Sequence, residues 1–236
     1  MSPSRRSADA ALGLAGLWGL SALQAAKLEK HCRSISVHRG EAICRRGDRL
    51  PGAFAVTSGT VKLSLHGHDE ERVLRIVGEG ETFGEAVSVL SKPSPYDASA
   101  LSDASLVAVP PAAMWSLLRR DARFAKALVT KLAESVLEML SELEAATTQR
   151  SAQRLATYLE SLARLDGASG PCTVKLPVSK TVVAARLGVK KETLSRLLKQ
   201  FSGDGIIGVT RREIMILDPD RLSAAAQEAP REHAKA

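Results

Sequence analysis

Short stretches of alternating apolar and polar residues, separated by glycines, fill the region from residue 35 to residue 109. Residues 61–65 are Val-Lys-Leu-Ser-Leu, and Val73 and Ile76 belong to another such stretch. A period of two is typical of strands with one buried face, and regularly spaced glycines are typical of the turns between them. Residues 104–110 supply a last strand. We therefore expect an antiparallel jelly-roll barrel here.

From Pro111 onward the apolar period becomes helical. We expect a short helix over 111–119, a long helix over 121–147 and a third over 149–165. The long helix carries apolar residues at alternating spacings of four and three, which is a heptad seam. The seam consists of Ala125, Val129, Leu132, Val136, Met139, Leu143 and Ala146.

A heptad seam favours pairing with a second helix, so we interpret this one as a homodimer contact. The predicted dimer residues are Val129, Leu132, Val136, Met139 and Leu143. A second apolar stripe on the same helix can pack on the barrel, and it comprises Leu128, Leu137 and Leu140. The alternative is a core helix inside a monomer, which the length and regularity of the seam disfavour.

The N-terminal region contributes little chemistry. Residues 1–16 predict a disordered tail, and Ser21 is a candidate N-cap for a helix running to about residue 31. Arg5-Arg6 before an apolar run resembles a twin-arginine signal, but Gly13, Gly16 and Gly19 interrupt that run. No segment is long and apolar enough to span a membrane, so we expect a cytoplasmic protein.

Residues 180–199 fit a helix-turn-helix in their spacing. Ala184 falls where the two helices must cross closely, and Gly188 falls in the tight turn, where a left-handed backbone favours glycine. Ser179 is a candidate N-cap for the first helix. The small core between the helices is expected to contain Leu187, Val189, Leu194 and Leu197.

The second helix of this motif separates its faces by residue type. Its inward face is expected to comprise Leu194, Leu197, Leu198 and Phe201. Its outer face follows the i, i+3, i+4, i+7 spacing of one helix side and comprises Glu192, Ser195, Arg196 and Lys199. This arrangement suits a recognition helix in a major groove. Residues 203–218 predict a β-hairpin, or wing, with Arg211 and Arg212 near its tip.

Residue chemistry assigns provisional roles on DNA. Arg196 can donate two hydrogen bonds to O6 and N7 of guanine, Glu192 can accept from the cytosine amine, and Ser195 can meet a thymine or adenine edge. Phosphate contacts are expected from the cations, namely Lys190, Lys191, Lys199, Arg211 and Arg212. Thr181 and Thr193 complete the predicted DNA-binding set.

Charge supports a polyanionic partner. Residues 148–236 hold 15 Lys and Arg against 9 Asp and Glu, a net charge of +6, whereas residues 1–147 have a net charge of +1. A localised positive field attracts phosphates. The three cysteines, Cys32, Cys44 and Cys172, show no metal-ligand spacing and predict reduced thiols. No catalytic constellation or phosphate loop is present, so an enzyme is not expected.

These elements together predict an α+β protein: a tail at 1–16, a barrel sensor domain at 17–120, a dimerisation helix at 121–147 and a winged helix-turn-helix at 148–236. This order resembles the CRP/FNR regulators from Leu17 onward. Residues 80–86, GETFGEA, resemble the barrel cassette of that family, and residues 192–207, ETLSRLLKQFSGDGII, resemble its recognition helix. The resemblance implies control by a small effector and contact with RNA polymerase.

The branch within that family bears on DNA sequence and effector. The Glu192, Ser195 and Arg196 pattern resembles the FNR branch and implies an inverted TTGAT-like repeat. That branch holds an iron–sulfur cluster with a group of N-terminal cysteines, whereas here only Cys32 precedes the barrel, so a cluster is not expected. The effector pocket implied by the resemblance comprises Gly84, Glu85, Tyr96 and Asp97.

Cyclic AMP is the less favoured effector, because the cyclic-nucleotide branch has Arg-Ser where this chain has Tyr96-Asp97. That change removes a bidentate phosphate contact, and the Asp97 carboxylate would repel the ligand. A cyclic-nucleotide-responsive regulator, or a ligand-binding module without DNA binding, remains the alternative.

Residues 80–100 and 176–196 are most similar to the DNR-type branch, whose members respond to nitric oxide through haem. That similarity implies a possible haem cofactor. The candidate axial ligands are His31, His38, His66 and His68, and each could equally be structural or solvated.

Overall fold

The structure is a computed structural model that describes residues 18, 20, 25, 28–67, 70–165, 167 and 170–227. The predicted tail at 1–16, most of the predicted helix that follows it, and His68 lie outside the described residues. The chain divides into two compact units, Met1–Leu137 and Glu138–Ala236. The division falls within the long helix rather than at either of its ends.

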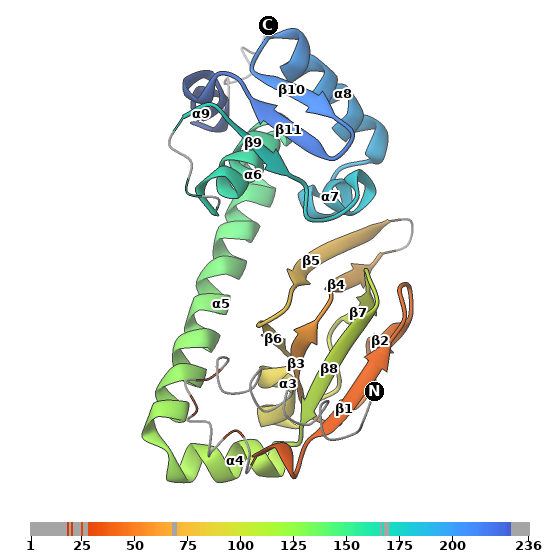
Figure 1. The fold of residues 1–236 in the computed structure, drawn as a ribbon, viewed down its shortest axis with the longest axis vertical. Coiled ribbons are helices and arrows are strands. Elements are labelled where there is room, and N and C mark those ends of the chain that lie inside the picture. The colour runs from red at the N-terminus through yellow and green to blue at the C-terminus, as the bar shows by residue number, and fades with distance from the viewer. Residues whose placement is uncertain are drawn as a thin grey trace, which may run out of the picture. The chain divides into compact units, whose positions relative to one another are not determined.

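The first unit is built on two antiparallel four-stranded sheets with strand orders β1-β8-β3-β6 and β2-β7-β4-β5 (Figure 1). The strands are β1 Arg33–Val37, β2 Ala42–Cys44, β3 Ala53–Ser58, β4 Val61–His66, β5 Glu71–Val77, β6 Thr82–Phe83, β7 Asp97–Ala100 and β8 Ala104–Val109. This pairing confirms the jelly-roll expectation, including the strand predicted at 104–110.

The core between the two sheets is made by the inward residues of the alternating strands. Phe54 and Phe83 stack with ring centroids 4.9 Å apart, and Val61, Val77 and Leu106 are buried beside them. Such a core follows directly from the period-two pattern, because alternate side chains share one face.

One turn of the roll requires glycine. Gly59 has a φ of 83°, and a Cβ at that position would lie 2.3 Å from the carbonyl oxygen of Asp103. Glycine therefore permits both the left-handed backbone and the close approach.

Three helices follow or interrupt the strands of the first unit: α3 Glu85–Leu90, α4 Pro111–Arg120 and α5 Ala122–Thr148. Pro111 occupies the first turn of α4, where its missing N–H costs nothing. The Asp121 carboxylate caps α5, since its Oδ1 accepts from the backbone N–H groups of Arg123 at 2.9 Å and Phe124 at 3.1 Å.

The base of α5 is anchored in a second core. Phe124 and Leu128 are buried with Trp18 and Met114, and Leu132 packs against the same cluster while partly exposed. Leu132 was predicted to belong to the dimer seam alone, so its contact with this core is a difference from the sequence expectation. It arises because Leu132 lies at i+4 from Leu128, next to the buried stripe.

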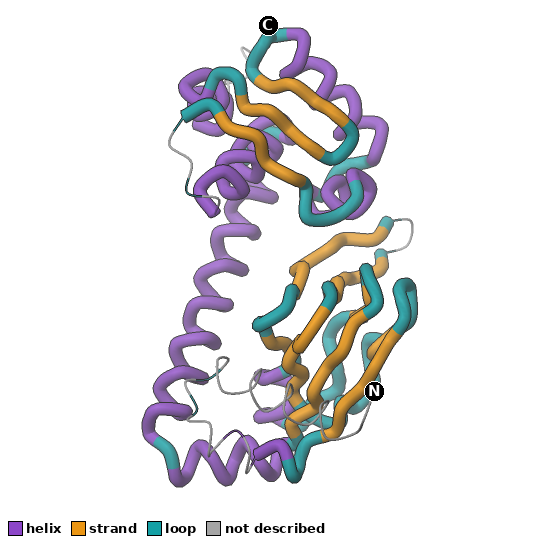
Figure 2. Tube along the Cα trace, viewed as in Figure 1, coloured by secondary structure: helices purple, strands orange, loops and turns teal. Residues whose placement is uncertain are grey.

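The second unit combines the end of α5 with helices around a three-stranded sheet of order β10-β11-β9 (Figure 2). Its elements are α6 Ser151–Leu165, β9 Cys172–Lys175, α7 Lys180–Leu187, α8 Lys191–Gly203, β10 Ile207–Thr210, β11 Glu213–Ile216 and α9 Pro219–Gln227. Leu159, Leu194, Ile207 and Ile214 are buried in its core. None of the helices in the described part of the chain combines the length and apolar character needed to cross a bilayer.

Candidate nucleic-acid interface and effector pocket

The turn between α7 and α8 has the geometry that the sequence predicted. The Ser179 hydroxyl accepts from the backbone N–H of Val182 at 3.4 Å and so caps α7. Gly188 ends α7 with φ 63° and ψ 41°, a left-handed conformation. Ala184 is 2% exposed, so a larger side chain there would displace α8. Three residues with small side chains, Ser179, Ala184 and Gly188, therefore determine the start, the crossing and the turn of the helix-turn-helix.

The two faces of α8 are separated as expected. Leu194, Leu197, Leu198 and Phe201 are buried. Glu192, Ser195, Arg196 and Lys199 are all exposed, as are Lys190 and Lys191 at the start of the helix. Among the other predicted contacts, Thr181 is exposed at the start of α7 and Thr193 is half-buried. The outer face is thus a continuous polar surface on a rigid helix.

Most cations of this surface form no ion pair with a described residue. Within the described residues, Lys191, Arg196, Lys199 and Arg211 take part in no ion pair. A guanidinium or ammonium without an internal partner keeps its full charge for an external anion.

The wing differs from the prediction at one of its two arginines. Thr210 pairs with Glu213, so Arg211 and Arg212 form the two-residue turn of the hairpin. Arg211 is exposed with a φ of 53°. The Arg212 guanidinium instead donates to the carbonyl oxygen of Leu176 at 2.9 Å. That bond ties the turn to the end of β9, so Arg212 has a structural contact in addition to the predicted phosphate role.

Sequence reasoning missed an arginine that connects the end of α5 with the helix-turn-helix. Arg154 on α6 donates from Nη1 to the carbonyl oxygen of Gln149 at 2.6 Å and from Nε to that of Leu187 at 3.0 Å. These carbonyls belong to the junction after α5 and to the last residue of α7. We call this pair of bonds the Arg154 clamp. No periodic pattern marked it, because its partners are backbone atoms.

The predicted effector pocket centres on the roll interior. Gly84 precedes α3 with a φ of 84°, and Glu85 follows it at 7% exposure. In the described structure, Glu85 Oε1 and the Ser88 hydroxyl are buried without a hydrogen-bond partner. Burial raises the pKa of Tyr96, as do Cys44 and Glu85, against smaller lowering effects of Arg75 and the Gly84 backbone. Glu85 and Tyr96 therefore lie near enough for the Glu85 charge to act on the Tyr96 hydroxyl.

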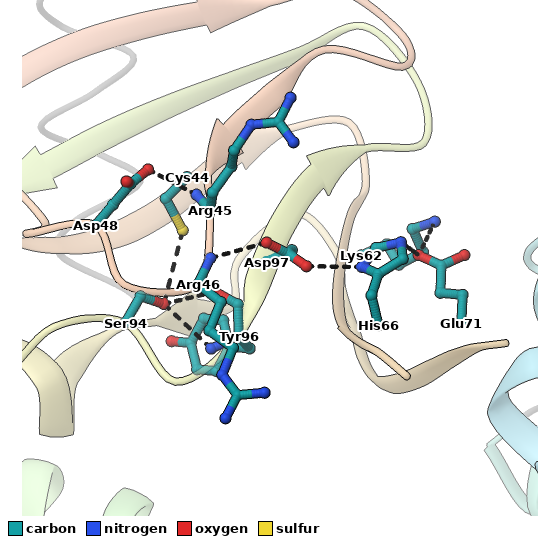
Figure 3. Close-up of polar contacts among 10 residues, drawn as sticks. All are labelled: Cys44, Arg45, Arg46, Asp48, Lys62, His66, Glu71, Ser94, Tyr96 and Asp97. Atoms are coloured by element: carbon teal, nitrogen blue, oxygen red, sulfur yellow. Dashed lines mark hydrogen bonds and ion pairs between the residues drawn. The ribbon is translucent and has the colours of Figure 1, made fainter. Parts of the chain in front are cut away.

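Asp97, which the sequence also placed in the effector pocket, has its polar contacts with Arg46 and His66 (Figure 3). Along β7 the alternate residues Ala98 and Ala100 enter the core, so Asp97 lies on the opposite face. Its Oδ1 accepts from the Arg46 backbone N–H at 2.8 Å, and its Oδ2 lies 2.7 Å from Nδ1 of His66. The Arg46 bond, followed by His66, holds the pKa of Asp97 below its usual value despite some burial. Its carboxylate is therefore not available to repel a ligand inside the roll.

The candidate haem ligands differ in what surrounds them. His66 lies between Asp97 and Glu71, and His38 is 91% exposed with Asp103 3.7 Å away. His31 lines a cavity of the first unit. The described residues contain no group of three or more His, Cys, Asp or Glu side chains arranged for a metal ion.

The cysteines are free thiols. Burial raises the pKa of Cys32 to about 11, with Glu29 adding to the effect, and burial also raises the pKa of Cys44. Little thiolate forms at neutral pH under those conditions, which disfavours redox control at either position.

A jelly roll, a long helix and a winged helix-turn-helix with unpaired outward cations define a DNA-binding regulator with an effector-binding domain. The family model described as "Cyclic nucleotide-binding domain" matches residues 34–121, and the one described as "Crp-like helix-turn-helix domain" matches residues 153–225. The chain belongs to the CRP/FNR family of transcription regulators.

Curated relatives and solved structures agree with this placement. The "Transcriptional activator protein Anr" of Pseudomonas protegens is 25% identical over 197 residues, covering 82% of this chain and 80% of that protein. The "CRP-like cAMP-activated global transcriptional regulator" of Mycobacterium tuberculosis is 24% identical over 223 residues, covering 93% and 100%. A CooA mutant from Carboxydothermus hydrogenoformans shares the fold with a TM-score of 0.77 at 20% identity, covering 91% and 94%. The family's members are transcription regulators rather than enzymes.

Proposed function

We propose that the chain acts as a homodimer on double-stranded DNA, recognises an inverted repeat of TTGAT-like half-sites, and changes its affinity for that repeat when a small effector binds. The observation that carries the DNA specificity is the outer face of α8, where Glu192, Ser195 and Arg196 are exposed on one side of a well-packed helix. RNA polymerase is the further partner we infer, because a regulator at a promoter acts on the enzyme that transcribes it.

The proposed role of each side chain follows from its chemistry and its exposure to solvent. Arg196 is exposed and takes part in no ion pair with a described residue, so its fork of donors is available to O6 and N7 of the guanine in TTGAT. Glu192 in the first turn can accept from the N4 amine of the paired cytosine. Lys191, Lys199 and Arg211 supply phosphate contacts around them.

Competition binding to TTGAT-N4-ATCAA and to a duplex with the guanine–cytosine pairs replaced tests this assignment. Arg196→Lys keeps the charge but loses the bidentate geometry, so we expect preference for the cognate duplex to fall by about 10-fold to 100-fold. Phosphate-driven affinity for unrelated DNA should change little. Gln200→Ala, at an exposed position of the same helix, is the matched control. Unchanged sequence preference in Arg196→Lys would remove Arg196 from the base contacts.

Dimerisation is proposed on the exposed apolar face of α5. Val129, Val136, Met139 and Leu143 are 53–63% exposed, and Leu137 and Leu140 beside them are equally open. An apolar stripe of this length on a soluble helix favours a protein partner. Two-fold pairing along it would present two α8 helices to the two halves of an inverted repeat.

For the effector, the residues near Glu85 and Tyr96 disfavour a cyclic nucleotide. A cyclic phosphate needs a cation, whereas Tyr96 stands where the arginine is expected. Arg75, the nearby cation, is tied to Glu81 at 2.9 Å and to the carbonyl oxygen of Thr82 at 3.1 Å. We expect no heat of binding from micromolar cyclic AMP in titration calorimetry. A clear isotherm would favour the cyclic-nucleotide-responsive alternative, which the name of the mycobacterial relative makes worth testing.

Nitric oxide sensed through haem remains the effector that we propose to test beside it. His31 lines a cavity of about 720 Å³, so it is the candidate that we propose would hold the iron. A haem-loaded protein should show a Soret band that shifts with nitric oxide and is lost in His31→Ala but kept in His38→Ala. Absence of stoichiometric haem would leave the DNA-binding proposal intact and exclude this signal.

A further inference from the structure

A groove of about 720 Å³ lies outside the jelly roll, beside the point where α4 ends and α5 begins. Its apolar wall includes Leu28, Pro110, Ala113 and Leu117. Leu28 is buried in the core cluster that contains Trp18, and Ala113 and Leu117 pack against that cluster. The groove therefore has a firm apolar wall, and its size is within the range of small-molecule sites.

The rim of the groove is cationic. Lys30, His31 and Arg120 line it, all three are exposed, and none is ion-paired with another described residue. The acid on this rim, Asp121, uses its Oδ1 to cap α5 through the N–H groups of Arg123 and Phe124. The two permanent cations, Lys30 and Arg120, outnumber the one carboxylate, Asp121, so the rim is net positive beside an apolar wall.

We propose that this groove, which we call the α4–α5 groove, binds an amphipathic organic anion. The apolar body would lie against Leu28 and Leu117, and its carboxylate would meet Arg120 and Lys30. A plain inorganic anion would leave the apolar wall unused, and an uncharged apolar molecule would leave the cations unpaired. Two sources carry this chemistry: a medium-chain or aromatic carboxylic acid, and haem, whose propionates are carboxylates on a larger apolar body.

The position of the groove places it at the start of α5. Arg120 is the last residue of α4, and Asp121 has an extended backbone, with φ −134° and ψ 103°, between the two helices. A ligand joining Lys30 to Arg120 would restrain this junction and hence the base of α5, which carries the apolar dimer face. The regulatory part of this inference rests on the proposed function, whereas binding in the groove does not.

Intrinsic fluorescence gives a direct binding test. The chain has two tryptophans, so Trp115→Phe leaves Trp18, in the cluster behind the apolar wall, as the sole reporter. The full-length Trp115→Phe protein is titrated with octanoate, with 3-phenylpropionate and, separately, with haem. We expect saturable quenching at micromolar to low-millimolar concentrations, and in the haem arm a Soret band that sharpens and shifts from that of free haem only if haem is bound. Arg120→Gln should weaken binding about tenfold, since it removes a charge-assisted hydrogen bond.

The matched control is Arg119→Gln, on the same helix and equally exposed but outside the groove, which should stay within about twofold of the parent protein. Equal losses in Arg119→Gln and Arg120→Gln, or no saturation with any probe, would overturn the proposal. Binding of the simple acids alone, or of haem alone, identifies the source. Operator affinity is measured in parallel without probe, so a protein that binds the probe but not DNA would refute the proposed function and not the groove.

Discussion

The α5 helix is buried only at its base and the α8 helix buries one whole face, and their exposed surfaces differ in kind. On α5 the exposed face is apolar, with Leu137 66% and Met139 63% accessible, while Phe124 and Leu128 are buried at its base. On α8 the exposed face is polar, and its Arg196 and Lys199 have no acidic partner among the described residues. Open apolar area favours a protein partner, and unpaired cations on a rigid helix favour a polyanion. The exposed surfaces of α5 and α8 therefore favour different kinds of partner.

The largest effect is expected from charges placed on the apolar surface of α5. Val136→Glu combined with Met139→Glu places two charges in the proposed dimer seam, so we expect a monomer in light scattering. Loss of the second half-site contact should lower operator affinity by at least about 100-fold. Ser141→Glu, an exposed position on the opposite side of the helix, is the control and should remain dimeric. A stable dimer of the double variant would place the interface elsewhere.

A smaller effect is expected where the end of α5 is connected to the helix-turn-helix. The Arg154 clamp joins the junction after α5 to the end of α7, and Arg154→Lys cannot keep both carbonyl bonds. We expect the second unit to lose about 1–2 kcal/mol in free energy of unfolding. Operator affinity should fall about tenfold, because α7 would be less well positioned. Arg164→Lys on the same helix, 70% exposed, is the matched control. Unchanged operator affinity at reduced stability would make the clamp purely structural.

In the wing, the neighbouring residues Arg211 and Arg212 are expected to have different roles, one in binding phosphate and one in stability. Arg211→Ala should leave the unfolding midpoint unchanged and reduce the salt dependence of DNA binding by about one phosphate, a slope change of about 0.9. Arg212→Ala should instead lower the midpoint, since it removes the bond to the Leu176 carbonyl. The measurements are operator affinity at salt concentrations from about 50 to about 300 mM, and thermal unfolding. The reverse pattern would exchange the two roles.

Much of this molecule follows from the pattern of its residues, and the exceptions share a cause. Strand alternation, the heptad seam, the Ser179 cap and the Gly188 turn are local, so periodicity and backbone chemistry predicted them. The Arg154 clamp, the Arg212 bond and the Asp97–His66 pair join residues far apart in sequence through single polar contacts, which no period marks. The place of Asp97 on the outward side of β7 likewise depends on strand register.

The smallest effect concerns charge that is used inside the first unit. Hydrogen bonding to the Arg46 N–H and pairing with His66 hold the pKa of Asp97 below the ordinary value of 3.8. Because the folded-state pKa is the lower one, the ionised carboxylate stabilises the fold above about pH 4, and this contribution is lost as pH falls through the folded value. We expect Asp97→Asn to lower the urea midpoint at pH 7 slightly and to reduce the difference between wild type and variant below pH 4. Glu79→Gln, an exposed acid in a turn, is the control. A constant difference between wild type and Asp97→Asn from pH 7 to pH 3 would mean that the bond to Arg46 contributes no charge-dependent stability. The charge of Asp97 would then contribute nothing to stability, in contrast to the unpaired cations of α8, whose charge we propose to act on DNA.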